Sequence, residues 1–415
     1  MSAQSQNNHT SPLVVLTTLF FMMGFITCMN DILIPHLKEI FDLSYVQAML
    51  IQFCFFTAYA VMSIPMGAFV GKVGYKNGVI GGFLLTAVGC LLFYPAAGSH
   101  SYAVFLGALF ILASGVTLLQ VAGNPYVTLL AKPGKESATL TLVQAFNALG
   151  TTIAPQIGAF LILADATQTV SKAEQISSVQ IPYLGLAGLL IILAVFVKMI
   201  RLPDARKIAA EESAQNCRRG KRAQPRRQTS VWQYKHLVFG TAGIFCYVGA
   251  EVSIGSLMVN VLGYLKGLDH ASAAHYLSFY WGGAMVGRFL GSAVMAKFAP
   301  NRYLAFNASA AVVLLAVAMA TGSGNADVAM WSLLAIGFFN SIMFPTIFSL
   351  ATKGLGKFTN AASGVLCTAI VGGAVVPVVQ GWVADTYTLM SSFVVSVICY
   401  LYIVFFAVYG YRADK

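Results

Sequence analysis

Charged side chains are scarce in this chain of 415 residues: Asp and Glu together number 14, and all charged residues make up 9% of the composition. An average soluble protein carries roughly 25% charged residues, so this chain has too few to cover a water-facing surface. Hydrophobic residues account for 58% of it, and the mean hydropathy is +0.76. These values exclude a water-soluble enzyme and indicate a surface that faces lipid.

Motifs of catalytic and redox chemistry are also missing. The sequence has no Cys-x-x-Cys among its 7 cysteines, no G-x-x-x-x-G-K-[ST] for nucleotide phosphates, no G-x-S-x-G and no H-E-x-x-H. The 6 histidines are scattered, without metal-ligand spacing. We therefore expect no enzyme, no cofactor, no disulfide framework and no protein-bound metal site, and an ATP-driven pump is disfavoured.

Long apolar runs fill the rest of the chain, and each is long enough for a membrane crossing of roughly 20 to 25 residues. The first run is too long for a signal-peptide core and has no evident cleavage site, so we expect it to be retained as a span. The polar breaks divide the chain into twelve predicted spans: 13–37, 45–71, 78–98, 102–131, 138–163, 181–201, 236–265, 271–297, 303–322, 327–352, 360–384 and 388–411.

Basic residues set the expected orientation. They concentrate in the loops after even-numbered spans and in the segment 202–233, which includes the run Arg218–Arg227. By the positive-inside rule these loops and both termini are cytoplasmic. The run could also suggest contact with nucleic acid or anionic lipid, but orientation is the favoured explanation, so we expect no nucleic-acid partner. The predicted organisation is a tail 1–12, a bundle 13–201, a linker 202–233, a bundle 234–411 and a tail 412–415.

An internal repeat relates the two bundles at an offset of 220 residues. It aligns Gly67-Ala-Phe-Val-Gly71 with Gly287-Arg-Phe-Leu-Gly291 and places Asp31 opposite Glu251. With six spans in each half, equivalent spans run in the same direction, as in parallel repeats related by an axis along the membrane normal. The expected fold is an all-α integral membrane protein of two six-helix bundles related by a parallel pseudo-two-fold axis, the architecture of alternating-access transporters of the major facilitator type.

Asp31 and Glu251 are the only acids well inside predicted spans. A carboxylate near the bilayer centre costs at least about 2.5 to 3.5 kcal/mol unless it is neutralised, paired or wet. No Lys or Arg is expected at comparable depth, because Arg288 falls near the predicted cytoplasmic end of its span. We therefore predict that both acids couple transport to a cation, either a proton or a sodium ion, with sodium placed at Asp31. The alternative is that either acid only hydrogen-bonds a neighbouring helix.

Deep amides suggest the substrate, because Asn and Gln both donate to and accept from sugar hydroxyls. Helical spacing puts Gln120 and Asn124 on one face of the fourth span, and Gln144 and Asn147 on one face of the fifth. The candidate sugar contacts are Gln120, Asn124, Gln144 and Asn147, with Asn30, Asn340 and Gln380 as further amides and Trp281 as the ring that covers a pyranose face. Each amide could equally be interhelical glue, and ordinary packing is the alternative for the aromatic rings.

Several strings resemble the fucose, galactose and glucose cation symporters of the major facilitator superfamily. They are MNDILIP at 29–35, QVAGNPY at 120–126 and FPTIFSL at 344–350, and the likeness extends over essentially all twelve spans. CYVGAEVSIGS at 246–256 looks like the glucose and galactose branch, in which the seventh span carries the acid.

The resemblance implies roles for single residues. Asp31 matches the first-span Asp that is associated with proton coupling and sugar binding in the family's fucose–proton symporter, whereas Gln120 stands where that symporter has a Glu. Gln144 and Asn147 match amides of the family's sugar site. The resemblance also implies uptake across a bacterial inner membrane, with either a proton or, as in some relatives, sodium.

We therefore expect a monomeric transporter that imports a monosaccharide by cation symport through alternating access. The sugar would be a glucose- or galactose-like hexose, or fucose or an amino sugar. A proton-coupled efflux antiporter for drugs or metabolites fits the same fold, although it predicts a greasier cavity with fewer paired amides. A membrane receptor or enzyme without transport is the third alternative, and the absence of catalytic motifs and of a large soluble domain disfavours it.

Overall fold

The computed structural model of the chain describes residues 10–40, 45–98, 101–158, 172–200, 203 and 230–412. The helix bounds are given for all of these segments, but side chains are not described throughout: those of 10–11, 29–40, 45–50, 97–98, 155–158, 172–179, 270–271 and 274 are left out. The predicted tails and nearly all of the linker 202–233 thus lie outside the described residues. Helices dominate, and the described residues contain no β-strand, which confirms the all-α prediction.

Six long helices form the first half of the sequence, and each overlaps one predicted span. They are α1 (Thr10–Ile40), α2 (Tyr45–Val73), α3 (Tyr75–Gly98), α4 (Tyr102–Leu130), α5 (Glu136–Gly158) and α6 (Lys172–Met199). The largest difference is at α6, which begins nine residues before the predicted 181, because the polar segment from Lys172 is helical although it is not apolar.

The second half is more interrupted. After the short 3₁₀ helix η3 (Val231–Gln233) come α8 (Lys235–Lys266), α9 (His270–Met295), α10 (Pro300–Thr321), α11 (Ala326–Asn340), α12 (Met343–Ala351), η4 (Gly356–Phe358), α13 (Thr359–Thr368), η5 (Ala369–Val371), α14 (Gly372–Thr386), η6 (Ser391–Phe393), α15 (Val394–Phe405) and the π-helical η7 (Phe406–Gly410). The predicted spans 327–352 and 360–384 are each broken into two helices, which hydropathy alone does not reveal.

Local residues explain several helix ends. Asn325 caps α11 by accepting a hydrogen bond from the Val328 N–H at 3.2 Å, and α10 begins with Pro300, which loses no helical hydrogen bond at that position. Gly267 ends α8 with a φ of 63°, a left-handed conformation that glycine adopts at little cost.

Nine spans among the described residues are long and apolar enough to cross a membrane. Three further helices, α1, α5 and α9, complete the predicted twelve. α5 is less apolar than the others because it carries Gln144, Asn147 and Thr151 along its middle. The membrane-spanning character of the chain therefore stands.

Two compact units make up the structure, and they depart from the sequence halves in two segments. The first comprises 1–130, 146–229 and Gly356–Thr368, and the second comprises Ala131–Ala145, Ser230–Leu355 and Ala369–Lys415. Within the first unit, α13 packs on α2 and α4. Within the second, the first turns of α5 contact α12, where the hydroxyls of Ser137 and Ser349 lie 2.5 Å apart.

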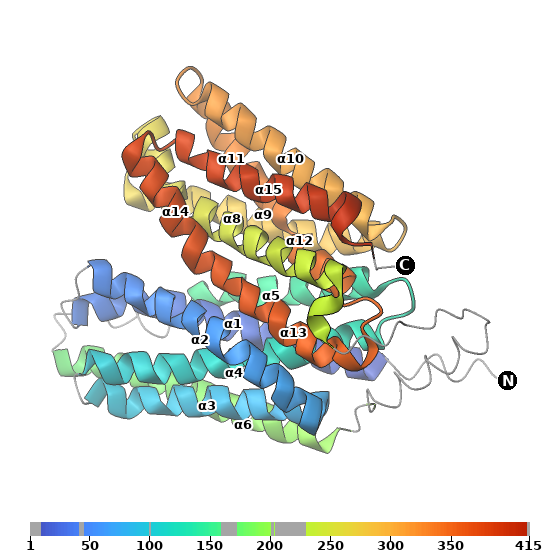
Figure 1. Cartoon of the computed structure of the whole chain (residues 1–415). Coiled ribbons are helices and arrows are strands. Elements are labelled where there is room, and N and C mark those ends of the chain that lie inside the picture. Colours follow the sequence, from blue (N-terminus) through green and yellow to red (C-terminus); the bar gives the residue numbers. More distant parts are fainter. Residues whose placement is uncertain are drawn as a thin grey trace, which may run out of the picture. The chain divides into compact units, whose positions relative to one another are not determined.

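Helices of the first unit pack closely where small residues face a neighbouring backbone. In Figure 1, α3 lies beside α4 and α6. A Cβ on Gly89 would come 2.5 Å from Leu112, and one on Gly115 would come 2.4 Å from the Thr86 backbone nitrogen. Such glycines allow membrane helices, which gain little from the hydrophobic effect, to associate through van der Waals contact.

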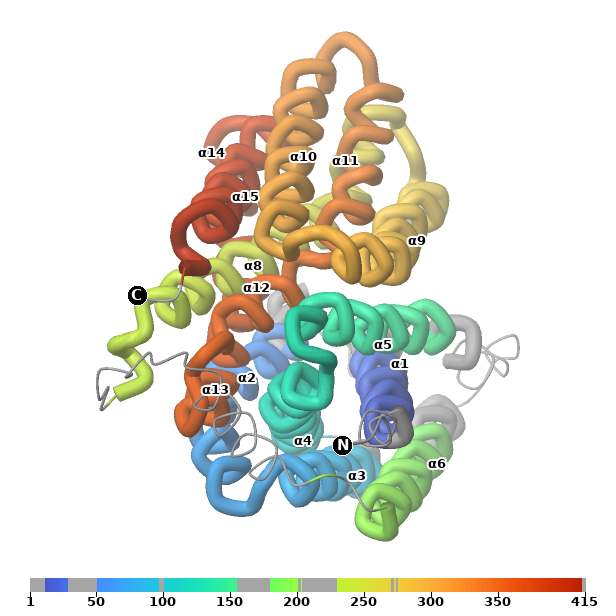
Figure 2. Tube along the Cα trace, turned by 90° about the vertical axis from the view of Figure 1, so that its right-hand side faces the viewer, coloured from blue at the N-terminus to red at the C-terminus, as the bar shows by residue number. Residues whose placement is uncertain are grey.

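In the second unit α11 contacts both α9 and α10, and α8 contacts α14, α15 and α12. Figure 2 shows α10 between α15 and α11. A Cβ on Gly337 of α11 would come 2.0 Å from the Tyr280 carbonyl oxygen of α9, and one on Gly372 of α14 would come 2.1 Å from the Phe245 carbonyl oxygen of α8. These crossings hold the helices that carry the polar residues described below.

Large apolar side chains cover the outside of both units. Ile181 and Ile192 of α6 are 72% and 65% exposed, and Val378 and Trp382 of α14 are 71% and 65% exposed. In water such surfaces would cause aggregation. They are the expected surface of a protein whose solvent is the bilayer.

Candidate functional site

The first unit holds part of the predicted site where α1 crosses α5. The Asn147 side-chain amide donates to the Phe20 carbonyl oxygen at 2.8 Å. On either side, a Cβ on Gly24 would come 2.1 Å from the Asn147 carbonyl oxygen, and one on Gly150 would come 2.2 Å from the Phe21 carbonyl oxygen. The amide of Asn147 therefore links the two helices at their closest approach, which is the interhelical role that the sequence left open.

Asp31 and Asn30 follow this crossing along α1. Both belong to the helix Thr10–Ile40, but their side chains lie outside the described residues. Their roles as coupling group and sugar contact stay predictions.

The remaining amides of α4 and α5 differ in their surroundings. Gln120, half-buried on α4, donates from Nε2 to the Tyr59 hydroxyl of α2 at 3.0 Å. Asn124, one turn further along α4, is completely buried, and Gln144 of α5 is 8% exposed. The pairing of Gln120 with a phenol was not foreseen, although Tyr59 falls in the middle of a predicted span.

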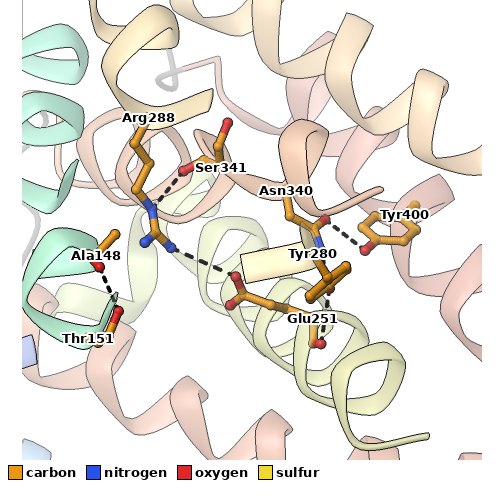
Figure 3. A network of polar contacts seen from close by, with 8 residues as sticks. All are labelled: Ala148, Thr151, Glu251, Tyr280, Arg288, Asn340, Ser341 and Tyr400. Carbon is orange, nitrogen blue, oxygen red and sulfur yellow. Dashed lines mark hydrogen bonds and ion pairs between the residues drawn. The ribbon is translucent and has the colours of Figure 1, made fainter. Parts of the chain in front are cut away.

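A chain of hydrogen bonds runs through the second unit around Asn340, the last residue of α11. Its side-chain nitrogen donates to the Tyr280 hydroxyl of α9 at 2.8 Å, and its oxygen accepts from the Tyr400 hydroxyl of α15 at 2.7 Å. The Tyr280 hydroxyl in turn donates to the Glu251 carbonyl oxygen of α8 at 3.2 Å. Figure 3 shows Asn340 beside Tyr280 and Tyr400. Four helices are thus joined through one fully buried amide, and a sugar would reach it only in exchange for these bonds.

Gln380 and Trp281, the other candidates of this unit, have contrasting positions. Gln380 is completely buried on α14, where its oxygen accepts from the Ser396 hydroxyl at 2.8 Å and its nitrogen donates to the Ser392 hydroxyl at 3.5 Å. Trp281 is 43% exposed and lies edge-on to the Tyr280 ring, against Gly255 of α8. Of the two, Trp281 is the one with a partly exposed side chain.

Glu251 does not lie alone in the second unit. The Arg288 guanidinium of α9 approaches it, with Nη2 3.8 Å from Glu251 Oε1, and the side chains of this pair are 16% and 12% exposed. The same guanidinium donates from Nε to the Ser341 carbonyl oxygen at 3.2 Å (Figure 3). The prediction that no basic residue reaches the depth of Glu251 is therefore wrong: position within a span does not measure how far a long side chain reaches.

Arg288 is the main residue of this region that sequence reasoning missed. The internal repeat could have identified it, because the 220-residue offset aligns Arg288 with an alanine of the string Gly67–Gly71. A basic residue that lies inside a span of one half, where the equivalent position of the other half is uncharged, is a candidate partner for a deep acid.

The polar residues give the described parts of the two units a chemistry of hydrogen bonds and, in the second unit, a largely buried ion pair. No group of His, Cys, Asp or Glu among the described residues could hold a metal ion. Within each unit the amides connect helices, and the Glu251 carboxylate lies beside an arginine. Such an arrangement can orient hydroxylated ligands and hold charge.

Comparison with known proteins places this geometry in a family. The profile described as Major Facilitator Superfamily matches residues 14–370. A glucose/galactose transporter of Brucella abortus is 52% identical over 411 residues, which cover 99% of this chain and 96% of the relative. The L-fucose-proton symporter of Escherichia coli is 31% identical, with 98% of this chain and 94% of the relative covered.

A solved structure agrees with the sequence comparisons. The crystal structure of FucP, a major facilitator transporter in the outward conformation, matches with a TM-score of 0.83 at 31% identity, covering 96% of this chain and 98% of that chain. These relatives are transporters, which confirms the expectation of a transporter rather than an enzyme. The chain belongs to the major facilitator superfamily, in the group of sugar transporters that includes the glucose/galactose transporters and the L-fucose–proton symporters, and it is closer to the glucose/galactose branch.

Proposed function

We propose that this multi-pass membrane transporter imports a glucose- or galactose-like monosaccharide together with a cation, by alternating access. The observation that carries the proposal is the 52% identity, over 99% of the chain, to a glucose/galactose transporter. The more distant relative is named as a proton symporter of a related sugar, which supports coupling to a cation. The bacterial relatives support a place in a bacterial inner membrane, and the basic loops support cytoplasmic termini. The proposed working unit is a monomer.

Asp31 is the proposed coupling group, with a proton or a sodium ion as its cation. It is an acid inside a membrane-spanning helix, and such acids are costly unless a cation or water compensates them. The helix that carries it is fixed against α5 by the Asn147 amide and by Gly24. A cation bound at Asp31 would therefore act on the same helix pair as a sugar bound by α5.

For the sugar, the proposed contacts are Gln120, Asn124, Gln144 and Asn147 of α4 and α5, with Trp281 of α9 as the covering ring. The half-buried Gln120 and the half-exposed Trp281 are the strongest of these, because a sugar can reach them without first opening a buried network. Asn340 and Gln380 are weaker, since both ends of each amide are already used within their unit.

Uptake into liposomes reconstituted with the purified protein tests the proposal. A panel of labelled sugars would be offered under a pH gradient alone and then under a sodium gradient alone. We expect accumulation of at least one hexose under one of the two gradients. Failure to accumulate or exchange any monosaccharide would refute the function, and export of a hydrophobic drug instead would favour the antiporter.

The variant Asp31→Asn tests the coupling group. Fixing the side chain near its neutral state should abolish accumulation against a gradient while sugar exchange between equal concentrations continues. Full concentrative uptake by Asp31→Asn would contradict the assignment.

A further inference from the structure

The second deep acid has a counter-ion within the protein. Glu251 of α8 and Arg288 of α9 are the two members of an ion pair with 3.8 Å between Oε1 and Nη2, and both side chains are largely buried. Within the part of the chain that the structure describes, Glu251 forms an ion pair with Arg288 alone.

Arginine keeps its charge under all physiological conditions, so the pair is neutral as a whole when Glu251 is ionised. Attraction between opposite charges is strong where the effective dielectric constant is low, and removal of one partner leaves the other uncompensated. Glu251 thus needs no transported cation to exist at this depth. The argument that assigned a cation to it from the sequence assumed that no such partner existed.

The guanidinium also binds the end of a broken helix. The span formed by α11 and α12 breaks between Asn340 and Met343, and Arg288 Nε donates to the carbonyl oxygen of Ser341 at this break. Carbonyl groups at a helix C-terminus lack helical partners and carry partial negative charge, which a guanidinium satisfies. Gly287 permits the approach of α9, because a Cβ there would come 2.5 Å from the Ser341 hydroxyl.

We propose that Arg288 is the resident counter-ion of Glu251, and that Glu251 is a positioning residue which holds this guanidinium against the break after α11 and does not bind the coupling cation. The inference rests on the proposed symport. It leaves Asp31 as the coupling acid and assigns the charge of the second acid to the framework of the second unit.

A double-mutant cycle of Glu251→Gln and Arg288→Met in liposomes tests the pair. In the wild-type background, Glu251→Gln leaves a guanidinium unpaired, and we expect it to reduce sugar exchange by roughly tenfold or more. In the Arg288→Met background, where no charge remains to be balanced, the same change should cost less than about threefold. The double variant should still accumulate sugar against its concentration gradient, with the same charge moved per sugar as the wild type.

A second ion pair of the same unit supplies the control. Lys266 and Asp327 lie at helix ends, with side chains 32% and 65% exposed. Exposed pairs contribute little, so Asp327→Asn should change exchange by no more than about twofold.

Two results would overturn the proposal. Equal losses from Glu251→Gln in both backgrounds would show that the two residues are not coupled. Retained exchange with abolished accumulation, in Glu251→Gln and in the double variant alike, would show that Glu251 itself carries the cation.

Thermal melting of the same four proteins in detergent separates this proposal from the proposed function. If the wild type moves no monosaccharide, the symport fails, but the melting cycle still tests the pair. We expect Glu251→Gln to lower the melting temperature in the wild-type background and to leave it nearly unchanged in the Arg288→Met background. Equal shifts in both backgrounds would refute the pairing without reference to transport.

Discussion

Replacing Gly150 with alanine should separate α1 from α5 and damage the first unit. The added Cβ would lie 2.2 Å from the Phe21 carbonyl oxygen and 3.0 Å from the Phe25 backbone nitrogen. Ordinary contact begins at 3.4 Å, so the helices must move apart by about 1.2 Å. The hydrogen bond from Asn147 to Phe20, now 2.8 Å, would then lengthen to about 4.0 Å and be lost.

The magnitude follows from two contributions. Overpacking of a tight contact costs about 1 to 3 kcal/mol, and an interhelical hydrogen bond in a membrane protein contributes about 0.6 kcal/mol. Alanine also favours the helix over glycine by about 1 kcal/mol, and that gain must be removed by a control. Gly185→Ala on α6 is suitable, because nothing lies within 4 Å of its new Cβ.

Relative to this control, Gly150→Ala should lose about 2 to 4 kcal/mol of stability. Thermal melting in detergent measures the difference as a rank order, since unfolding of such proteins is commonly irreversible. Sugar exchange in liposomes should fall as well, because α1 carries the proposed coupling acid. The reasoning would be refuted if Gly150→Ala melted at the same temperature as Gly185→Ala.

Three further predictions concern single contacts. Gly337→Ala should melt at a clearly lower temperature than the control Gly282→Ala. The new Cβ at position 337 would lie 2.0 Å from a carbonyl oxygen of α9, whereas a Cβ at position 282 would have no atom within 4 Å. Equal melting temperatures would contradict this packing. Tyr400→Phe removes the donor to the buried amide at the end of α11 and should cost about 0.6 kcal/mol, seen as a small fall in melting temperature with transport retained. Tyr59→Phe removes the hydrogen-bond acceptor of Gln120 and should raise the Km of sugar exchange by about threefold with little change in maximal rate; an unchanged Km would separate Gln120 from the sugar.

The helices could be predicted from the sequence because a bilayer requires long apolar segments with internally satisfied backbones. The predicted start at 102 and the observed α4 (Tyr102–Leu130) illustrate this agreement. The break between α11 and α12 could not be predicted from the sequence, because both helices are apolar and the break is stabilised by Arg288 from another helix. A hydropathy window records composition along the chain and contains no information on donors that arrive from elsewhere.

The candidate site was predictable in its residue types and less so in its connections. Deep Asn and Gln residues stood out, and the structure shows where their hydrogen bonds go. Asn340 and Gln380 use both ends of the amide inside the second unit, and Asn147 uses its nitrogen between α1 and α5. From the sequence alone, interhelical hydrogen bonding and ligand contact are equally favoured for each amide, because both roles require the same side chains at the same helical spacing.

These hydrogen bonds and close contacts explain how the helices of one unit could stay packed together during transport. Without a hydrophobic force between helices, a unit must be held by close backbone contact and by polar links. Gly337 supplies the first kind beside Tyr280, Asn340 supplies the second with Tyr280 and Tyr400, and the Glu251–Arg288 pair adds a charged link on the same helices. Polar links that close inside one unit do not have to break when that unit moves as a body. A cation that must bind and leave in each cycle would instead need an acid whose charge is not balanced within its own unit. Glu251 faces Arg288 within its own unit, which is the reason to assign it to the framework.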